Sequence, residues 1–162
     1  MLAPSSLDPT YTERMRVGAL EVPLGLVQLI QAKRWPQSDD EERRQHLVPI
    51  VPTDRVHRFA PEEDELYLYA PPFRTVQQCC ESGETFWEES IAAPAELDFA
   101  RAVPIADFGL GTDAPVVLDY AAGAAPPRVR HLAWSRTGND NHWVLSAETF
   151  DEFARLLGLH PA

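Results

Sequence analysis

A chain of 162 residues with 44% apolar and 24% charged residues has the size and composition of one globular domain. Its 25 acidic side chains outnumber its 14 lysines and arginines, so the formal net charge is −11. Such a charge opposes nucleic-acid binding, which depends on basic contacts to phosphates. No apolar run exceeds the five residues 66–70. Because a membrane-spanning helix takes about 20, we expect no transmembrane segment.

The N-terminal residues predict a flexible tail over 1–17, followed by a single domain over 18–162. Prolines and serines are frequent in the first ten residues, and no apolar stretch typical of a secretory signal follows. The two cysteines, Cys79 and Cys80, are adjacent and offer no disulfide framework. We therefore expect a protein of the reducing cytoplasm.

The first half of the chain predicts helices and one good strand. Leu26, Val27 and Ile30 share one face of a helix predicted over 23–34, and residues 36–44 read as a polar loop. Residues 47–51 would form a strand only at a sheet edge, because Pro49 interrupts them. A strand is predicted at 65–70, and short helices are predicted at 75–81 and 84–90.

The second half changes to a β pattern. Four short apolar runs separated by turn residues predict an antiparallel sheet, with strands at 102–108, 115–120, 128–134 and 142–146. A closing helix over 147–157, capped by Ser146, would bury Phe150 and Phe153 and end at Gly158. The fold class predicted is α+β, with a central, mostly antiparallel sheet packed against helices.

Negative charge is concentrated in the middle of the chain. Residues 39–98 hold fifteen acidic side chains and five basic ones, with acidic runs at 39–42 and 62–65. Such a field attracts and steers a basic protein partner. The alternative is that these runs only solvate surface loops.

Signatures of catalysis are missing from the sequence. The triplet Asp107-Phe108-Gly109 matches a kinase motif by chance, because no glycine-rich loop or catalytic loop accompanies it. Five scattered histidines have no zinc-site spacing. Asp107, Asp113 and Asp119 would hold a cation only if they converged, and with His131 they would be the centre of any unrecognised enzyme. We expect no enzyme activity, no cofactor and no metal.

The ordered segments PIADFGLGTDAPVVLDY (104–120), PPRVRHLAW (126–134) and NHWVLSAETFDEFARLLGL (141–159) resemble the C-terminal half of the SUKH superfamily. This is the Smi/Knr-type family of bacterial immunity proteins and yeast cell-wall regulators. ELYLYAPPFRTV at 65–76 is similar to the middle of its bacterial members. The resemblance implies an α+β domain without catalysis. It also implies a protein partner, which for many bacterial members is a toxin and often a nuclease.

Together these observations predict an immunity-type protein that binds a basic toxin through its acidic middle third. Aromatic side chains among the acids would anchor the interface. The partner-binding residues expected are Glu62, Glu63, Asp64, Glu65, Tyr67, Tyr69, Trp87, Glu88 and Glu89. The alternative, which the yeast relatives favour, is a regulatory or scaffold domain that binds a peptide or small ligand. We expect no nucleic-acid and no membrane partner, and the sequence leaves the oligomeric state open.

Overall fold

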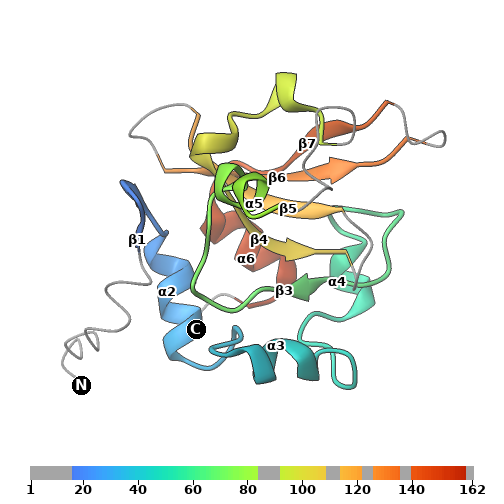
Figure 1. The fold of residues 1–162 in the computed structure, drawn as a ribbon. Helices are drawn as coiled ribbons and strands as arrows, with labels where there is room; N and C mark the ends of the chain where they lie inside the picture. Colours follow the sequence, from blue (N-terminus) through green and yellow to red (C-terminus); the bar gives the residue numbers. More distant parts are fainter. Residues whose placement is uncertain (1–15, 84–91, 109–113, 122–125, 136–139, 160–162) are drawn as a thin grey trace.

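A five-stranded antiparallel sheet forms the centre of the computed structural model, which describes residues 16–83, 92–108, 114–121, 126–135 and 140–159. Neighbouring strands follow the order β3–β4–β5–β6–β7, and helices pack against the sheet (Figure 1). The α+β prediction is confirmed. The strands are β3 (Tyr67–Leu68), β4 (Ala102–Asp107), β5 (Pro115–Asp119), β6 (Arg128–Ala133) and β7 (His142–Ala147).

The four strands predicted in the second half are confirmed within about two residues at each end. Every residue of β4 and β5 is buried, as expected of central strands that are covered on both faces. The outer strand β7 keeps only Trp143 and Ala147 buried. The burial pattern therefore separates the centre of the sheet from its β7 edge.

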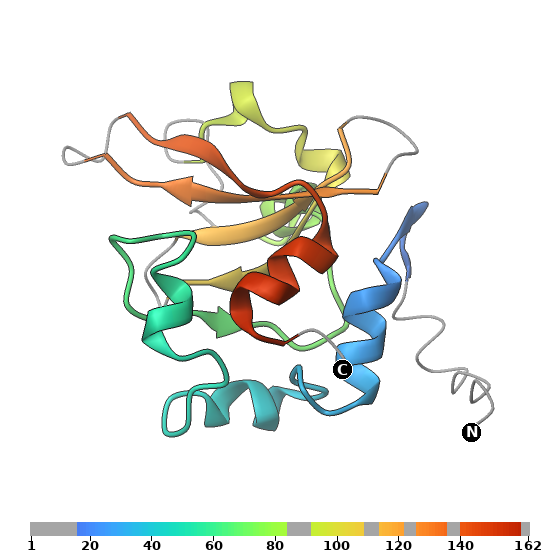
Figure 2. The same ribbon diagram turned by 180° about the vertical axis from the view of Figure 1, so that it is seen from behind.

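One face of the sheet carries α6 (Phe150–Leu157), with α2 (Leu24–Gln31) and α4 (Thr53–Val56) beside it (Figure 2). Phe150 and Phe153 enter the larger apolar core there. Gly158 has a φ of +74° and ends α6 in the left-handed conformation, as predicted. Among the described residues, no helix is long and apolar enough to cross a membrane.

The opposite face is covered by α5 (Val76–Glu81) and two short 3-10 helices, η2 (Pro94–Glu96) and η3 (Phe99–Arg101). In Figure 1, α5 lies in front of the sheet and α6 behind it. Val117, Leu132 and Trp143 project from the strands into this smaller core. The predicted helix at 75–81 is confirmed, and Thr75 caps it through a reciprocal bond pair with Gln78.

The loop predicted at 36–44 is wrong, because Asp39–Arg44 form the helix α3. The Ser38 hydroxyl oxygen accepts a hydrogen bond from the Glu41 backbone N–H at 3.3 Å. Acidic residues occupy the first turn and two arginines the last, which complements the helix dipole. These polar residues therefore stabilise a helix although none of them is buried.

Four further segments differ from the predictions. The last two residues of the predicted tail, Arg16–Val17, form β1 and pair with β2 (Leu20–Glu21). Residues 47–51 form no strand, and β3 is shorter than the predicted 65–70. The last helix begins after Thr149 rather than Ser146, since β7 continues to Ala147, which pairs with Val129. The predicted helix at 84–90 and turn at 109–113 lie outside the described residues.

Candidate functional site

The acidic segment 62–65 connects α4 to the edge strand β3 and is held in place on both sides. The Glu63 N–H donates to the Ala60 carbonyl at 3.0 Å, and the Thr53 hydroxyl donates to the Asp64 carbonyl at 2.9 Å. His57 Nε2 lies 3.0 Å from an Asp64 carboxylate oxygen. Glu62, Asp64 and Glu65 are nevertheless exposed. The segment therefore presents carboxylates from an anchored backbone.

Glu63 differs from its neighbours because its side chain is half-buried. Burial raises the pKa of Glu63, and the negative charges of Asp107, Glu62 and Asp64 raise it further. Its carboxyl thus lies near Asp107 at the end of β4. Of the four acids expected to face a partner, Glu63 is the only one whose side chain is not fully exposed.

Tyr67 and Tyr69, expected as interface anchors, are used mainly inside the fold. Tyr67 is 7% exposed, and its ring centroid lies 5.2 Å from that of His46. The Tyr69 hydroxyl donates to Asp107 Oδ2 at 3.2 Å, and burial raises the Tyr69 pKa, followed by the charge of Asp107. Both tyrosines support β3 and leave little aromatic surface for a partner. Trp87, Glu88 and Glu89 lie outside the described residues.

The other acidic run, residues 39–42, lies on α3. Two of its carboxylates accept hydrogen bonds, and two are exposed. Glu42 accepts a hydrogen bond from the Ala70 N–H at 2.7 Å, and burial raises the Glu42 pKa. Glu41 accepts one from the Gln37 N–H at 2.6 Å. Asp39 and Asp40 point to solvent. Half of this run thus fixes α3 against the domain, and the other half remains exposed.

Both acidic runs border β3. Helix α3 contacts Ala70, shortly after β3, and segment 62–65 lies just before β3 in the chain. Figures 1 and 2 show α3 and α4 beside this edge of the sheet. Within the described residues, no lysine or arginine forms an ion pair with any of their exposed carboxylates. We call this region the acidic surface and define it by Asp39, Asp40, Glu62, Asp64 and Glu65.

Two of the three aspartates considered as cation ligands, Asp107 and Asp119, do not converge. Asp107 pairs with Pro115 and Asp119 pairs with Ala102, which places the two carboxylates at opposite ends of the β4–β5 ladder. Asp119 instead lies 3.0 Å from Arg130 Nε in a half-buried ion pair. Asp113 is outside the described residues. Among those that are described, no group of three histidine, cysteine or acidic side chains could hold a metal ion.

Two histidines of the sheet have clear structural partners. His131 is buried, and its Nδ1 lies 2.7 Å from the Ser146 hydroxyl. His142 is exposed between two carboxylates, with Nδ1 2.7 Å from Glu96 and Nε2 2.9 Å from Asp140. The hydrogen bond to Glu96 and the charge of Asp140 raise the His142 pKa. Because Glu96 also accepts from the Trp143 N–H, this cluster fastens η2 to the β7 edge.

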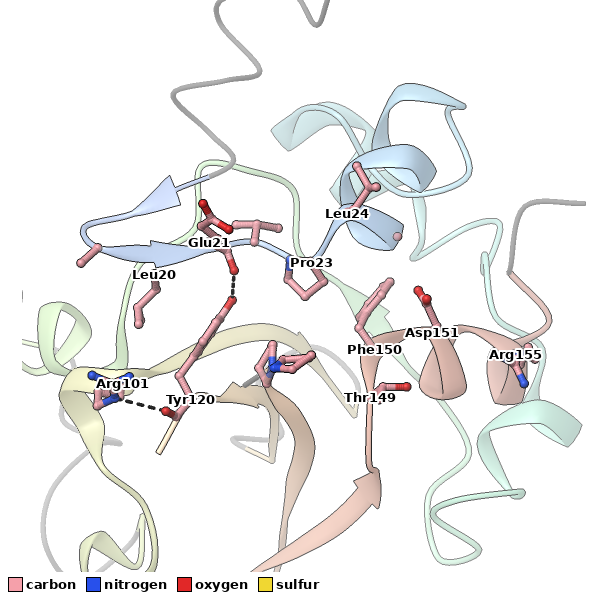
Figure 3. A pocket seen from close by; sticks show the side chains of 15 residues that line it. Leu20, Glu21, Pro23, Leu24, Arg101, Tyr120, Thr149, Phe150, Asp151 and Arg155 are labelled. Carbon is pink, nitrogen blue, oxygen red and sulfur yellow. Dashed lines mark hydrogen bonds between the residues drawn. The ribbon is translucent and has the colours of Figure 1, made fainter. Parts of the chain in front are cut away.

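A pocket of about 790 Å³ lies between β2, the start of α2, the residue that follows β5 and the start of α6, and nothing in the sequence patterns predicted it (Figure 3). The Tyr120 hydroxyl crosses to the hairpin and donates to the Glu21 carbonyl at 2.6 Å. Arg101 Nε donates to the Tyr120 carbonyl at 3.1 Å. Leu24 is 62% exposed at the rim. A Cβ on Gly25 would meet the carboxylate at the flexible end of the exposed Asp151 side chain, so α2 and α6 approach each other closely here.

Signals for part of this site were present in the sequence. Ser38 followed by Glu41 matches the capping pattern that starts α3. The pocket had no such signal, because its walls come from segments more than a hundred residues apart.

A comparison with protein-family models, with curated proteins and with solved structures finds no match to this chain.

Proposed function

We propose that this chain is a non-catalytic protein-binding domain of the SUKH type, an immunity protein that neutralises a basic bacterial toxin in the cytoplasm. The observation that carries the proposal is the acidic surface, whose exposed carboxylates project from hydrogen-bonded segments on either side of β3. The resemblance of residues 104–159 to SUKH proteins supports it, since many bacterial members neutralise toxins.

Electrostatics favours a basic partner over other classes. Residues 39–65 hold nine acidic side chains and four arginines. A surface of one sign raises the association rate of an oppositely charged protein by about 10- to 1000-fold. It repels phosphate backbones and anionic lipid surfaces for the same reason. The expected partner is therefore a protein with a lysine- and arginine-rich face.

Reversing Glu62 and Glu65 to lysine should slow association with such a partner by about tenfold, because steering depends on local charge. Glu63 and Asp64 are left unchanged, since one is half-buried and the other contacts His57. The partner is to be sought among basic proteins encoded beside this gene, and the measurement is the stopped-flow association rate. For the unmodified chain this rate should also fall with salt, since the Debye length shortens from about 10 Å at 0.1 M to about 3 Å at 1 M.

The matched control reverses Glu81 and Glu148, two exposed acids that change the net charge equally but lie outside the acidic surface. This variant should associate almost as fast as the unmodified chain. The proposal is contradicted if neither salt nor the Glu62 and Glu65 reversals change the association rate, or if no basic protein binds. Unchanged thermal unfolding would show that the reversals leave the fold intact, as expected for exposed charges.

A second function is favoured by the pocket beside α2 and α6. Its volume of about 790 Å³ falls within the roughly 300–1,000 Å³ typical of ligand sites. Its floor contains the buried rings of Tyr120 and Phe150, and its rim carries Arg155 and Asp151. Its lining is shared almost equally between polar and apolar groups, which suits a short peptide or a small polar organic ligand, the regulatory alternative.

A thermal-shift screen with short peptides and small organic acids and amines tests this alternative. A ligand at 100 times its dissociation constant stabilises by about 2.7 kcal/mol. For a domain of this size, that corresponds to about 5–11 °C in Tm. Leu24→Arg should abolish the shift by filling the rim, whereas Leu145→Arg, at an exposed position on β7, should preserve it. No shift across the panel would argue against a ligand-binding role for the pocket.

A further inference from the structure

Two acids and two bases line the pocket between β2, the start of α2 and the start of α6, namely Glu21, Arg101, Asp151 and Arg155. Glu21 lies 3.2 Å from Arg16 in an exposed ion pair, and Arg101 Nε donates to a backbone carbonyl. Within the described residues, neither Asp151 nor Arg155 forms an ion pair. Figure 3 shows these two side chains on α6, at the opposite end of the pocket from Arg101.

Asp151 and Arg155 are four residues apart in α6, the spacing at which an acid and a base commonly pair across one helical turn. Here the Asp151 carboxylate lies instead against Gly25, in the first turn of α2. Helix α2 has no side-chain cap and no acid in its own first turn. Its N-terminus therefore favours a negative charge at this position. The carboxylate and the guanidinium thus stay apart, and both remain exposed to a ligand in the pocket.

Apolar groups adjoin this charged end of the pocket. Phe150 directly precedes Asp151, and its buried ring lies beside Pro23 (Figure 3). Tyr120 also lines the pocket, and its hydroxyl is already bonded to a backbone carbonyl, so its ring offers an apolar surface. Leu24 is 62% exposed at the rim. The lining therefore combines one negative group, one positive group and an apolar surface.

We propose that this pocket binds a small zwitterion with a large apolar side chain, either a free amino acid or a di- or tripeptide with both ends unblocked. The inference rests on the second proposed function and names the class of its ligand. The ligand ammonium lies at the Asp151 carboxylate. The ligand carboxylate lies at Arg155, whose planar guanidinium can bind both carboxylate oxygens. A ligand with only one charge would make only one of these contacts.

The test is a calorimetric titration of the full chain with leucine and with the dipeptide leucyl-leucine. The tighter of the two is then compared with its N-acetylated form, which lacks the ammonium, and with its C-terminal amide, which lacks the carboxylate. Each blocked form should bind at least about tenfold more weakly, equivalent to about 1.4 kcal/mol. Binding of either free compound supports the proposal, and their relative affinities separate amino acids from peptides as the source of the ligand.

Substitutions in the pocket should respond to one blocked end each. Asp151→Asn should weaken binding of the free ligand and make the affinity insensitive to acetylation, because the ammonium has lost its partner. Arg155→Gln should make the affinity insensitive to amidation. A substitution that only destabilises α6 would not remove the effect of one chosen end. The matched control is Asp54→Asn with Arg58→Gln, an exposed acid and arginine at the same spacing that do not line the pocket, and it should leave the affinity unchanged.

Three results would overturn the proposal. If a blocked form binds as tightly as the free compound, the ligand is not a zwitterion, although the pocket still binds it. If the control weakens binding as much as the pocket variants do, binding does not depend on Asp151 and Arg155. If neither leucine nor leucyl-leucine binds, the assigned ligand class is wrong. The thermal-shift panel then decides separately whether the pocket binds any ligand.

Discussion

Replacing Phe153 by alanine is expected to lower the free energy of unfolding by about 3–5 kcal/mol. The Phe153 side chain is fully buried, with its ring edge-on to Phe59 at 5.2 Å and tilted against Phe150 at 6.4 Å. Its removal would leave a cavity between α6 and the segment that follows α4. Denaturant unfolding followed by circular dichroism measures the loss, as a lower midpoint at an unchanged slope.

Arg155→Ala is the control for this substitution, because Arg155 lies on the exposed side of the same helix. It should change the stability by no more than about 0.5 kcal/mol. A loss below about 1 kcal/mol for Phe153→Ala would contradict the packing of α6 on the sheet. A similar loss for both variants would mean that the substitutions disturb α6 as a whole and that the burial of Phe153 is not the cause.

The sheet was predictable because its signals are local. Each of β4 and β5 is a short apolar run bounded by turn residues, and such runs identify strands without knowledge of their partners. The spacing of Phe150 and Phe153, followed by Gly158, likewise marks α6. The start of α6 was misplaced by three residues. Ser146 looks like a helix cap in sequence but bonds His131 across the strand pair.

The candidate site was harder to predict because its details depend on long-range contacts. The exposure of Glu62 and Glu65 follows from their charge, but no local pattern shows that Glu63 is half-buried near Asp107, more than forty residues away. The carboxylate of Glu42 is committed to the Ala70 backbone, which no local pattern shows. Sequence also favours burying Leu47, whereas the turn after α3 exposes it. Charge was therefore predictable, but the division between structural and exposed acids was not.

Acid should destabilise the domain through His131. Its ring lies among Phe108, Phe59 and Ser146, and burial lowers the pKa of His131 from 6.5 to about 4. Between these pH values the unfolded chain binds a proton that the folded chain does not. Stability from this group is therefore complete above about pH 6.5 and falls as the pH drops to 4, by about 3 kcal/mol in all.

The effect is isolated by comparing the unmodified chain with His131→Asn, because other groups titrate in the same range. The raised pKa values of Glu42 and Glu63 act in the opposite sense, since the folded chain takes up those protons first. When the free energy of unfolding is measured from pH 7 to pH 4, the unmodified chain should lose about 3 kcal/mol more than His131→Asn. This change with pH holds whatever the absolute stability of the variant.

Ser146→Ala decides whether burial or the hydrogen bond causes the effect. It removes the hydroxyl 2.7 Å from Nδ1 but keeps the imidazole among its aromatic neighbours. Because burial is the cause of the lowered pKa, this variant should retain most of the acid sensitivity. An NMR titration of the His131 ring gives the same answer independently. A ring that protonates near pH 6.5 in the folded chain would show that water reaches His131 and that the packing of Phe59 and Phe108 around it is open.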